Sequence, residues 1–233
     1  AEDGIRDYKV TGVQTCALPI FQEIERQRLI RSGYSKERAH EASRAGLISE
    51  DKYWYFVRET VKFPSNYYGL YNRILWKSGV KGPPGVGILP VDEEKNVYLN
   101  VNFRHATRSW ELEIPRGARK NGEPLEAAAK RELREETGFT LKELSLIGNI
   151  SPDSGVVAGV VPIFLGMIDY QGKAQTEFSE AISKIIKLSQ QEVDKGLAQG
   201  FMEIVLGGQK TRVEVRDSFL TFSLYHAKLK GMI

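Results

Sequence analysis

The sequence has little cysteine, little histidine and little net charge, and each shortage excludes a class of protein. Its 233 residues include one cysteine, Cys16, which excludes an internal disulfide framework. Cys16 falls in the adapter-like residues 1–20 described below, so thiol chemistry is not expected either. The three histidines, His40, His105 and His226, are isolated and lack metal-ligand spacing. A net charge of +3 does not predict nucleic-acid binding. No apolar run approaches the ~20 residues of a membrane span and no signal peptide is visible, so we expect a soluble cytoplasmic protein.

Residues 1–20, AEDGIRDYKVTGVQTCALPI, need separate treatment. They resemble the translated constant parts of a sequencing-library adapter, with Tyr8 and Lys9 in the place of the sample index. A genuine N-terminal extension is the alternative. We leave this stretch, with Cys16, out of the fold reasoning.

Residues 21–73 are charge-rich and favour helices. Ile24, Leu29 and Ile30 have the spacing of one helical face. We therefore predict a helical N-terminal segment over 21–73, followed by a main domain over 74–233. An aromatic cluster spans the end of this segment, and we interpret it as packing or a subunit contact rather than a platform for stacked bases. Its members are Tyr53, Trp54, Tyr55, Phe56, Tyr67, Tyr68, Tyr71 and Trp76.

From residue 74 onward, strand and helix patterns mix. Trp110, Leu112 and Ile114 alternate with Glu111 and Glu113, which is typical of a half-buried strand. Further strands are predicted over 86–91, 97–103, 144–150, 156–170 and 182–188, and helices over 124–137, 189–197 and 217–230. This mixture predicts an α/β/α sandwich with a mixed β-sheet.

The predicted helix over 124–137 carries an acidic face. Glu132, Glu135 and Glu136 stand at i, i+3 and i+4, so their carboxylates share one side of the helix. Like charges at this spacing repel, and a hard divalent cation would relieve the repulsion. Ligands that are all oxygen suit Mg²⁺, Mn²⁺ or Ca²⁺ rather than zinc. A solvated acidic face is the alternative for this spacing alone.

The wider segment decides between these readings, because it resembles the Nudix box, Gly-x5-Glu-x7-Arg-Glu-U-x-Glu-Glu-x-Gly-U, where U is a bulky aliphatic or aromatic residue. Every specified position is filled: Gly117, Glu123, Arg131, Glu132, Leu133, Glu135, Glu136, Gly138 and Phe139. The resemblance implies a Nudix hydrolase in which Glu132, Glu135 and Glu136 ligate Mg²⁺, with Mn²⁺ possible.

The resemblance also implies supporting roles around the box. Glu123 and Arg131 would brace the loop against the helix, and a weak surface salt bridge is the alternative. Gly117 and Gly138 would be structural. The backbone carbonyl of Arg116 would be a further metal ligand.

Motifs outside the box are similar to those of ADP-ribose pyrophosphatases and nucleoside-diphosphate-sugar hydrolases. They comprise residues 85–90, 102–104, 111–117, 151–155 and 217–224, and the similarity covers roughly residues 67–230. Two features depart from that group: Arg116 replaces a small residue, and residues 201–215 form a longer insert.

The same resemblance suggests further site residues. Arg104, Arg116 and Glu113 are candidates for substrate binding, with a sheet-edge salt bridge as the alternative for Arg104. Glu177 and Glu180 fall where relatives often place a catalytic base, with solvated loop carboxylates as the alternative.

The expected function is Mg²⁺-dependent hydrolysis of a nucleoside diphosphate linked to another moiety. ADP-ribose is the best single expectation, giving AMP and ribose 5-phosphate. Another NDP-sugar, NADH, a dinucleoside polyphosphate or an oxidised nucleotide is the first alternative. A non-catalytic ADP-ribose-binding sensor domain is the second. By analogy with the family we expect a homodimer, and we expect neither nucleic acid nor membrane as a partner.

Overall fold

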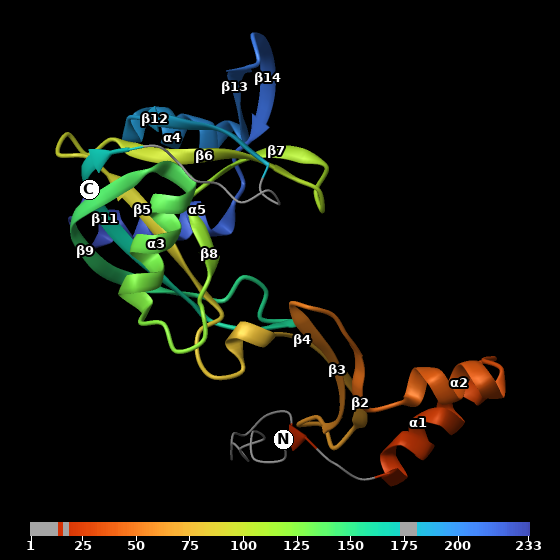
Figure 1. The fold of residues 1–233 in the computed structure, drawn as a ribbon. Coiled ribbons are helices and arrows are strands. Elements are labelled where there is room, and N and C mark those ends of the chain that lie inside the picture. Colours follow the sequence, from red (N-terminus) through yellow and green to blue (C-terminus); the bar gives the residue numbers. More distant parts are fainter. Residues whose placement is uncertain (1–13, 16–18, 173–180) are drawn as a thin grey trace. The chain divides into compact units, whose positions relative to one another are not determined.

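The computed structural model describes residues 14–15, 19–172 and 181–233, and the chain divides into two compact units (Figure 1). Unit 1 has two pieces: the chain up to Lys77, and Asp153–Ala158. Unit 2 contains Ser78–Pro152 and Gly159–Ile233. The sequence predicts a continuous main domain over 74–233. In the structure, Asp153–Ala158 belongs to unit 1, where Val157 and Ala158 pair with Ile74 and Leu75.

Unit 1 contains two helices and a sheet. Its helices are α1 (Pro19–Arg31) and α2 (Lys36–Ser43), and its strands are β1 (Gln14–Thr15), β2 (Gly46–Glu50), β3 (Trp54–Lys62), β4 (Tyr68–Trp76) and β10 (Val157–Ala158). Strands β1, β3, β4 and β10 follow one another across the sheet, and β2 pairs with β3. The predicted helical segment over 21–73 is therefore wrong beyond Ser43.

The reason for this error is the residue content of the β3–β4 hairpin. Aromatic and β-branched residues, which favour strands, fill both arms. The arms pair from Trp54 with Trp76 to Lys62 with Tyr68, and the two tryptophan rings stack with centroids 4.7 Å apart. Such cross-strand aromatic pairs stabilise a sheet. These two members of the aromatic cluster thus pack against each other within unit 1, while a subunit contact stays a prediction.

Unit 2 is built on a nine-stranded mixed sheet in the order β13-β14-β7-β6-β5-β11-β9, with β12 paired to β6 and β8 paired to β5. The strands are β5 (Gly85–Val91), β6 (Val97–Arg104), β7 (Ser109–Glu113), β8 (Arg116–Ala118), β9 (Phe139–Ile150), β11 (Val161–Gln171), β12 (Ile182–Leu188), β13 (Phe201–Leu206) and β14 (Gln209–Glu214). β5 and β11 run parallel, whereas β6 is antiparallel to β5, β7 and β12.

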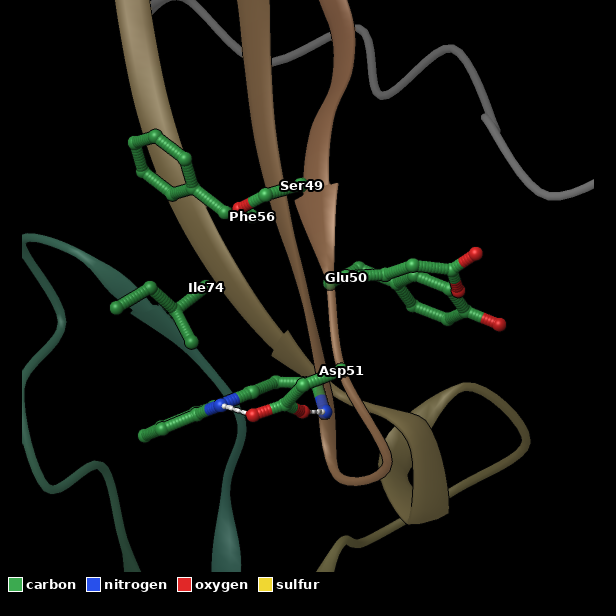
Figure 2. A pocket seen from close by; sticks show the side chains of 7 residues that line it. Ser49, Glu50, Asp51, Phe56 and Ile74 are labelled. Atoms are coloured by element: carbon green, nitrogen blue, oxygen red, sulfur yellow. Dashed lines mark hydrogen bonds between the residues drawn. The ribbon is translucent and has the colours of Figure 1, made fainter.

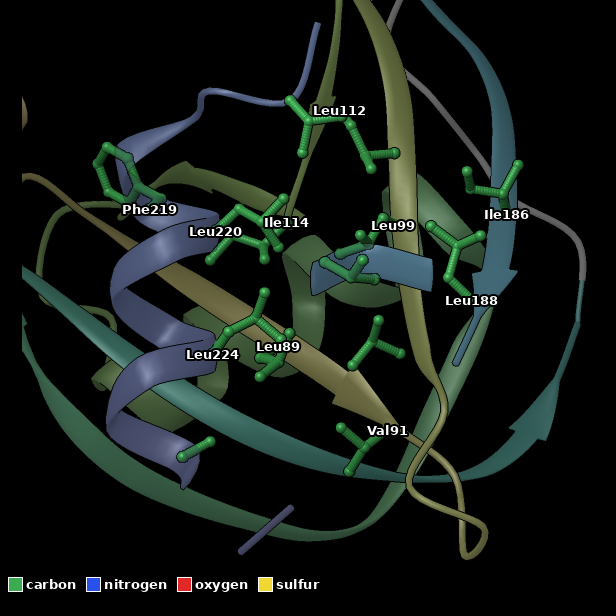
Figure 3. Close-up of a cluster of buried hydrophobic side chains, with 14 of the residues drawn as sticks. Leu89, Val91, Leu99, Leu112, Ile114, Ile186, Leu188, Phe219, Leu220 and Leu224 are labelled. Atoms are coloured by element: carbon green, nitrogen blue, oxygen red, sulfur yellow. The ribbon is translucent and has the colours of Figure 1, made fainter. Parts of the chain in front are cut away.

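Helices cover both faces of this sheet (Figure 1). On one face α3 (Leu125–Thr137) packs through Ala128 and Ala129 against Val86, Ile88 and Phe164. On the other face α5 (Ser218–Leu229) packs into the larger core, which Figure 3 shows around Leu89, Leu99 and Leu220. Helix α4 (Gln190–Gln199) joins that same core through Val193. The expected α/β/α sandwich with a mixed sheet is confirmed.

Two predicted elements differ in extent. The run over 156–170 is interrupted after β10, and its remainder forms β11, which pairs with β5 and β9. The insert over 201–215 forms the hairpin of β13 and β14. Among the helices of the described ranges, none combines the length and the apolar content needed to cross a membrane.

Candidate active site

Helix α3 places the acidic face, and its ends follow from the local sequence. Pro124 stands at the N-cap, where its missing N–H leaves no donor unpaired. Gly138 ends the helix with a φ of 77°, a left-handed conformation that suits glycine, and its N–H donates to the Arg134 carbonyl. The sequence-predicted helix over 124–137 is confirmed to within one residue.

The three glutamates of the acidic face differ in exposure. Glu132 and Glu136 are buried, with 7% and 5% of their surface exposed, whereas the Glu135 side chain is 29% exposed. The guanidinium of Arg131 lies between two of them, because its Nη1 donates to Glu132 Oε1 at 2.6 Å and to Glu135 Oε2 at 2.9 Å. Buried carboxylates need such partners, since burial of an unpaired charge is costly.

Arg131 also joins the helix to the preceding loop. Its Nε donates to Glu123 Oε1 and its Nη2 to Glu123 Oε2, both at 2.9 Å, and Nη2 also donates to the Ala118 carbonyl at 3.0 Å. The hydrogen bonds from Arg131 lower the pKa of Glu123 to about 2. This bidentate ion pair has the geometry expected of a brace between loop and helix.

Gly117 lies directly against the acidic face. It belongs to β8, where it pairs with Val86 of β5. A β-carbon built at Gly117 would lie 2.1 Å from Glu132 Oε2 and 2.2 Å from the carboxyl carbon. Any side chain at this position would therefore displace the Glu132 carboxylate, which explains on steric grounds why the box begins with glycine.

Asn100 is a polar residue of the site that the sequence reasoning missed. It is buried in β6, with 3% of its surface exposed, and its Nδ2 donates to Glu136 Oε2 at 2.6 Å. One signal could have found it. The buried residues Val97, Leu99 and Val101 alternate along β6 with the polar residues Asn100 and Asn102, which indicates that the second face of this strand is not simple core.

A second charged cluster joins β6, β7 and β8 to the start of α5. Arg104 Nε donates to both carboxylate oxygens of Glu113, at 2.8 and 3.0 Å. Arg116 donates from Nη2 to Glu113 Oε1 at 3.1 Å and from Nη1 to Asp217 Oδ1 at 2.7 Å. The guanidinium of Arg116 also lies 4.3 Å from the centroid of the Phe219 ring.

These contacts bear on two candidates for substrate binding. Arg104 forms a salt bridge with Glu113, and the side chain of Arg116 is held by two carboxylates and a ring. Burial raises the pKa of Asp217 even though Arg116 acts in the opposite direction. A role of Arg104, Arg116 or Glu113 in substrate binding stays a prediction.

The alternation in β7 led to one wrong expectation. A half-buried strand would expose Glu111 and Glu113, yet these are only 5% and 3% exposed. Both carboxylates have arginine partners: Glu111 accepts from Arg216 Nη2 at 2.8 Å, and Glu113 from Arg104. The alternation of residues in the sequence cannot show that this polar face is buried, because the arginines that pair with it come from other segments of the chain.

The donor chemistry of the acidic face fits a hard divalent cation. Glu132, Glu135 and Glu136 offer carboxylate oxygens alone, which Mg²⁺ and Mn²⁺ prefer. Across the described residues, however, no three His, Cys, Asp or Glu side chains converge as a metal site requires. The positive charge between Glu132 and Glu135 is instead the Arg131 guanidinium. These three glutamates would hold the cation, and a contribution from the Arg116 carbonyl stays a prediction.

Glu177 and Glu180 lie outside the described residues. His226 stacks on Phe222 with ring centroids 4.0 Å apart, which is a packing contact.

A hollow of about 190 Å³ lies in unit 1 beside β2, β3 and β4 (Figure 2). Its two carboxylates have local partners: Asp51 accepts from the backbone N–H groups of Tyr53 and Trp54, and Glu50 pairs with Lys77 at 2.8 Å. Asp51 thereby holds the turn between β2 and β3. Because the carboxylates of this hollow have structural partners, the hollow is not the candidate active site. We assign the candidate active site to the acidic face of α3, on the basis of its carboxylate chemistry.

Comparisons with known proteins identify the family of this chain. A sequence model of the NUDIX domain matches residues 81–199. An ADP-ribose pyrophosphatase of Bacillus subtilis is 37% identical over 86 residues, which are 37% of this chain and 46% of that protein. An ADP-sugar pyrophosphatase of Mus musculus is 36% identical over 98 residues, which are 40% of this chain and 45% of that protein. The matched part thus spans less than half of either relative.

A similar fold is also known from a solved structure. The crystal structure of an ADP compounds hydrolase superposes with a TM-score of 0.55, covering 65% of this chain and 79% of that chain. At 19% sequence identity, this likeness concerns the fold alone.

Proposed function

The chain belongs to the Nudix family, and from that premise we propose that it hydrolyses the diphosphate bond of a nucleoside diphosphate linked to another moiety. The observation that carries the proposal is the acidic face of α3, where Glu132, Glu135 and Glu136 stand at i, i+3 and i+4. Arg131 joins Glu132 and Glu135 to the loop that carries Glu123. All box residues are present, and they lie within the range that the NUDIX model matches.

The proposed substrate is ADP-ribose, which reacts with one water to give AMP and ribose 5-phosphate. The ADP-ribose and ADP-sugar pyrophosphatases among the relatives support this choice. Another NDP-sugar, NADH or a dinucleoside polyphosphate would use the same chemistry. A sensor domain that binds ADP-ribose without cleaving it is the alternative from another class, and the intact box argues against it.

Phosphoanhydride cleavage depends mainly on neutralising phosphate oxygens and positioning water. A divalent cation supplies both when it is bound. In this proposal Glu132, Glu135 and Glu136 hold the cation. The ion pair of Arg131 and Glu123 fixes the helix to the preceding loop, and Gly117 leaves room for the Glu132 carboxylate. Glu177 or Glu180 is the proposed base that accepts the proton of water.

Several finer points belong to the same proposal. Mg²⁺ is the proposed cation, with Mn²⁺ able to replace it. The protein is proposed to act as a cytoplasmic homodimer on a small molecule, without nucleic acid or membrane as partner. These points rest on analogy with the family and remain predictions.

The test is a screen of about ten nucleoside diphosphate compounds with Mg²⁺, followed by chromatography of the products. The proposal expects ADP-ribose to give AMP and ribose 5-phosphate, and EDTA to abolish the reaction. Cleavage of another compound alone would replace the substrate and keep the chemistry. Binding of ADP-ribose without turnover of any compound would favour the sensor and reject the hydrolase.

A further inference from the structure

The two faces of β6 differ in a way that the fold alone does not explain. Val97, Leu99 and Val101 are fully buried in the large core. Asn100 and Asn102 point to the other face of the strand, since successive side chains alternate. Asn100 reaches α3 on that face, because its Nδ2 donates to Glu136 Oε2 at 2.6 Å.

The other amide atom of Asn100 is the informative one. Asn100 is 97% buried, yet within the described ranges its Oδ1 accepts no hydrogen bond. A buried polar atom without a partner costs roughly 1–3 kcal/mol. Asparagine is also depleted in strands, where an aliphatic residue would pack without this cost. The stability of the sheet therefore does not account for an amide at this position.

The bond to Glu136 fixes which way the amide faces. A carboxylate oxygen accepts hydrogen bonds, so the atom 2.6 Å from Glu136 Oε2 must be the NH₂ group. The carbonyl oxygen Oδ1 is then the atom left to accept a proton donor. Asn100 stands opposite Glu113 in the β6–β7 pairing, and Glu113 is itself bound to Arg104 and Arg116.

We propose that Asn100 is a positioning residue of the hydrolytic site: Nδ2 orients the Glu136 carboxylate, and Oδ1 accepts a hydrogen bond from water that enters with the divalent cation. This inference rests on the proposed function, because Glu136 is taken there as one of the carboxylates that hold the cation. Groups that orient a metal-binding carboxylate tune its affinity for the metal, typically by 10–100-fold.

The experiment measures Mn²⁺ affinity by electron paramagnetic resonance, without substrate, in the full chain and in two variants. Asn100→Leu removes both amide atoms, so Mn²⁺ affinity should fall about tenfold and kcat should fall more than KM rises. Asn100→Asp places a second carboxylate against Glu136. It should lower the melting temperature of the metal-free protein and bind Mn²⁺ more tightly than Asn100→Leu.

The Mn²⁺ affinities of the two variants separate positioning from packing. A packing role predicts that both variants change the melting temperature and that Mn²⁺ affinity stays within about twofold of the starting protein. That result would overturn the inference. If Asn100→Leu fails to fold, the rise in melting temperature that Mn²⁺ causes in Asn100→Asp decides alone. Because Mn²⁺ relieves the repulsion between the two carboxylates, this rise should exceed that of the starting protein. A rise no larger than in the starting protein contradicts the proposal.

Asn102→Leu is the matched control. Asn102 lies two residues further along the same face of β6, is 8% exposed, and pairs opposite Glu111 rather than Glu113. Its substitution should leave Mn²⁺ affinity unchanged. The starting protein separates the two proposals: if it binds Mn²⁺ and cleaves no diphosphate, the proposed function fails, and the Mn²⁺ titrations still decide the role of Asn100.

Discussion

Gly117 and the Glu132 carboxylate occupy adjoining space, such that a β-carbon on the glycine would lie 2.1 Å from Oε2 of the glutamate. The Glu132 carboxylate can occupy this position only because residue 117 of β8 has no side chain. The glycine is needed here for close approach, whereas at Gly138 it is needed for a positive φ.

The first prediction is that Gly117→Ala lowers turnover by about 100-fold or more, because the methyl group must push Glu132 out of the acidic face. The measurement is kcat for ADP-ribose with Mg²⁺. Gly122→Ala is the control: Gly122 has a φ of 75° and no atom within 4 Å of a built β-carbon, so its substitution strains the loop without touching a carboxylate. Equal losses of kcat in both variants would argue against the steric explanation.

The second prediction concerns the pH dependence of the ion pair between Glu123 and Arg131. The pKa of Glu123 is lowered from 4.5 to about 2, chiefly by hydrogen bonds from Arg131. A lowered carboxyl pKa stabilises the folded state above the ordinary pKa, and this contribution is lost as the pH falls toward the folded value. Urea unfolding of the starting protein and of Glu123→Gln should therefore differ fully above about pH 5 and converge toward about pH 2.

Glu126→Gln serves as the control for this series, because Glu126 is exposed in the first turn of the same helix. Its effect on the free energy of unfolding should be much smaller at every pH. A Glu123→Gln effect that does not change between pH 6 and pH 3 would contradict the linkage.

The third prediction is that Arg116→Met destabilises the protein by roughly 3–5 kcal/mol, since it removes a partner from two buried carboxylates. The Asp217 and Glu113 side chains are only 8% and 4% exposed. Asp217 is the N-cap of α5, where its side chain accepts from the N–H of Leu220. Adding Asp217→Asn should restore part of the loss, because asparagine can keep this cap without the charge. Urea unfolding measures both variants. Unchanged stability with a raised KM would instead assign Arg116 to phosphate binding.

The sequence anticipated the elements whose signals are local. Helix α3 shows this best, since Pro124, three alanines and Gly138 set its ends and its propensity, and the box spacing identifies its acidic face. Helix α4 was likewise predicted, over 189–197, and in the structure Ser189 caps it and Glu192 completes a capping box. In both cases the decisive residues lie within a few positions of each other.

The sequence did not anticipate features that depend on distant partners. The helical prediction over 21–73 covers β3 and most of β4, although pairing of Trp54 with Trp76 holds these strands as a hairpin. Glu111 was expected at a solvated face and is instead covered, with Arg216 from the far end of the chain as its partner. Asn100 carries no local motif, and its contact with Glu136 joins β6 to α3.

The most direct test of the central claim is the turnover of ADP-ribose by Glu136→Gln, compared with the starting protein and with Glu126→Gln at saturating Mg²⁺. The account predicts that Glu136→Gln loses about 100-fold or more in kcat while its melting temperature stays nearly unchanged, and that Glu126→Gln keeps its rate. Near-normal turnover by folded Glu136→Gln would contradict the assignment of the cation to the acidic face of α3.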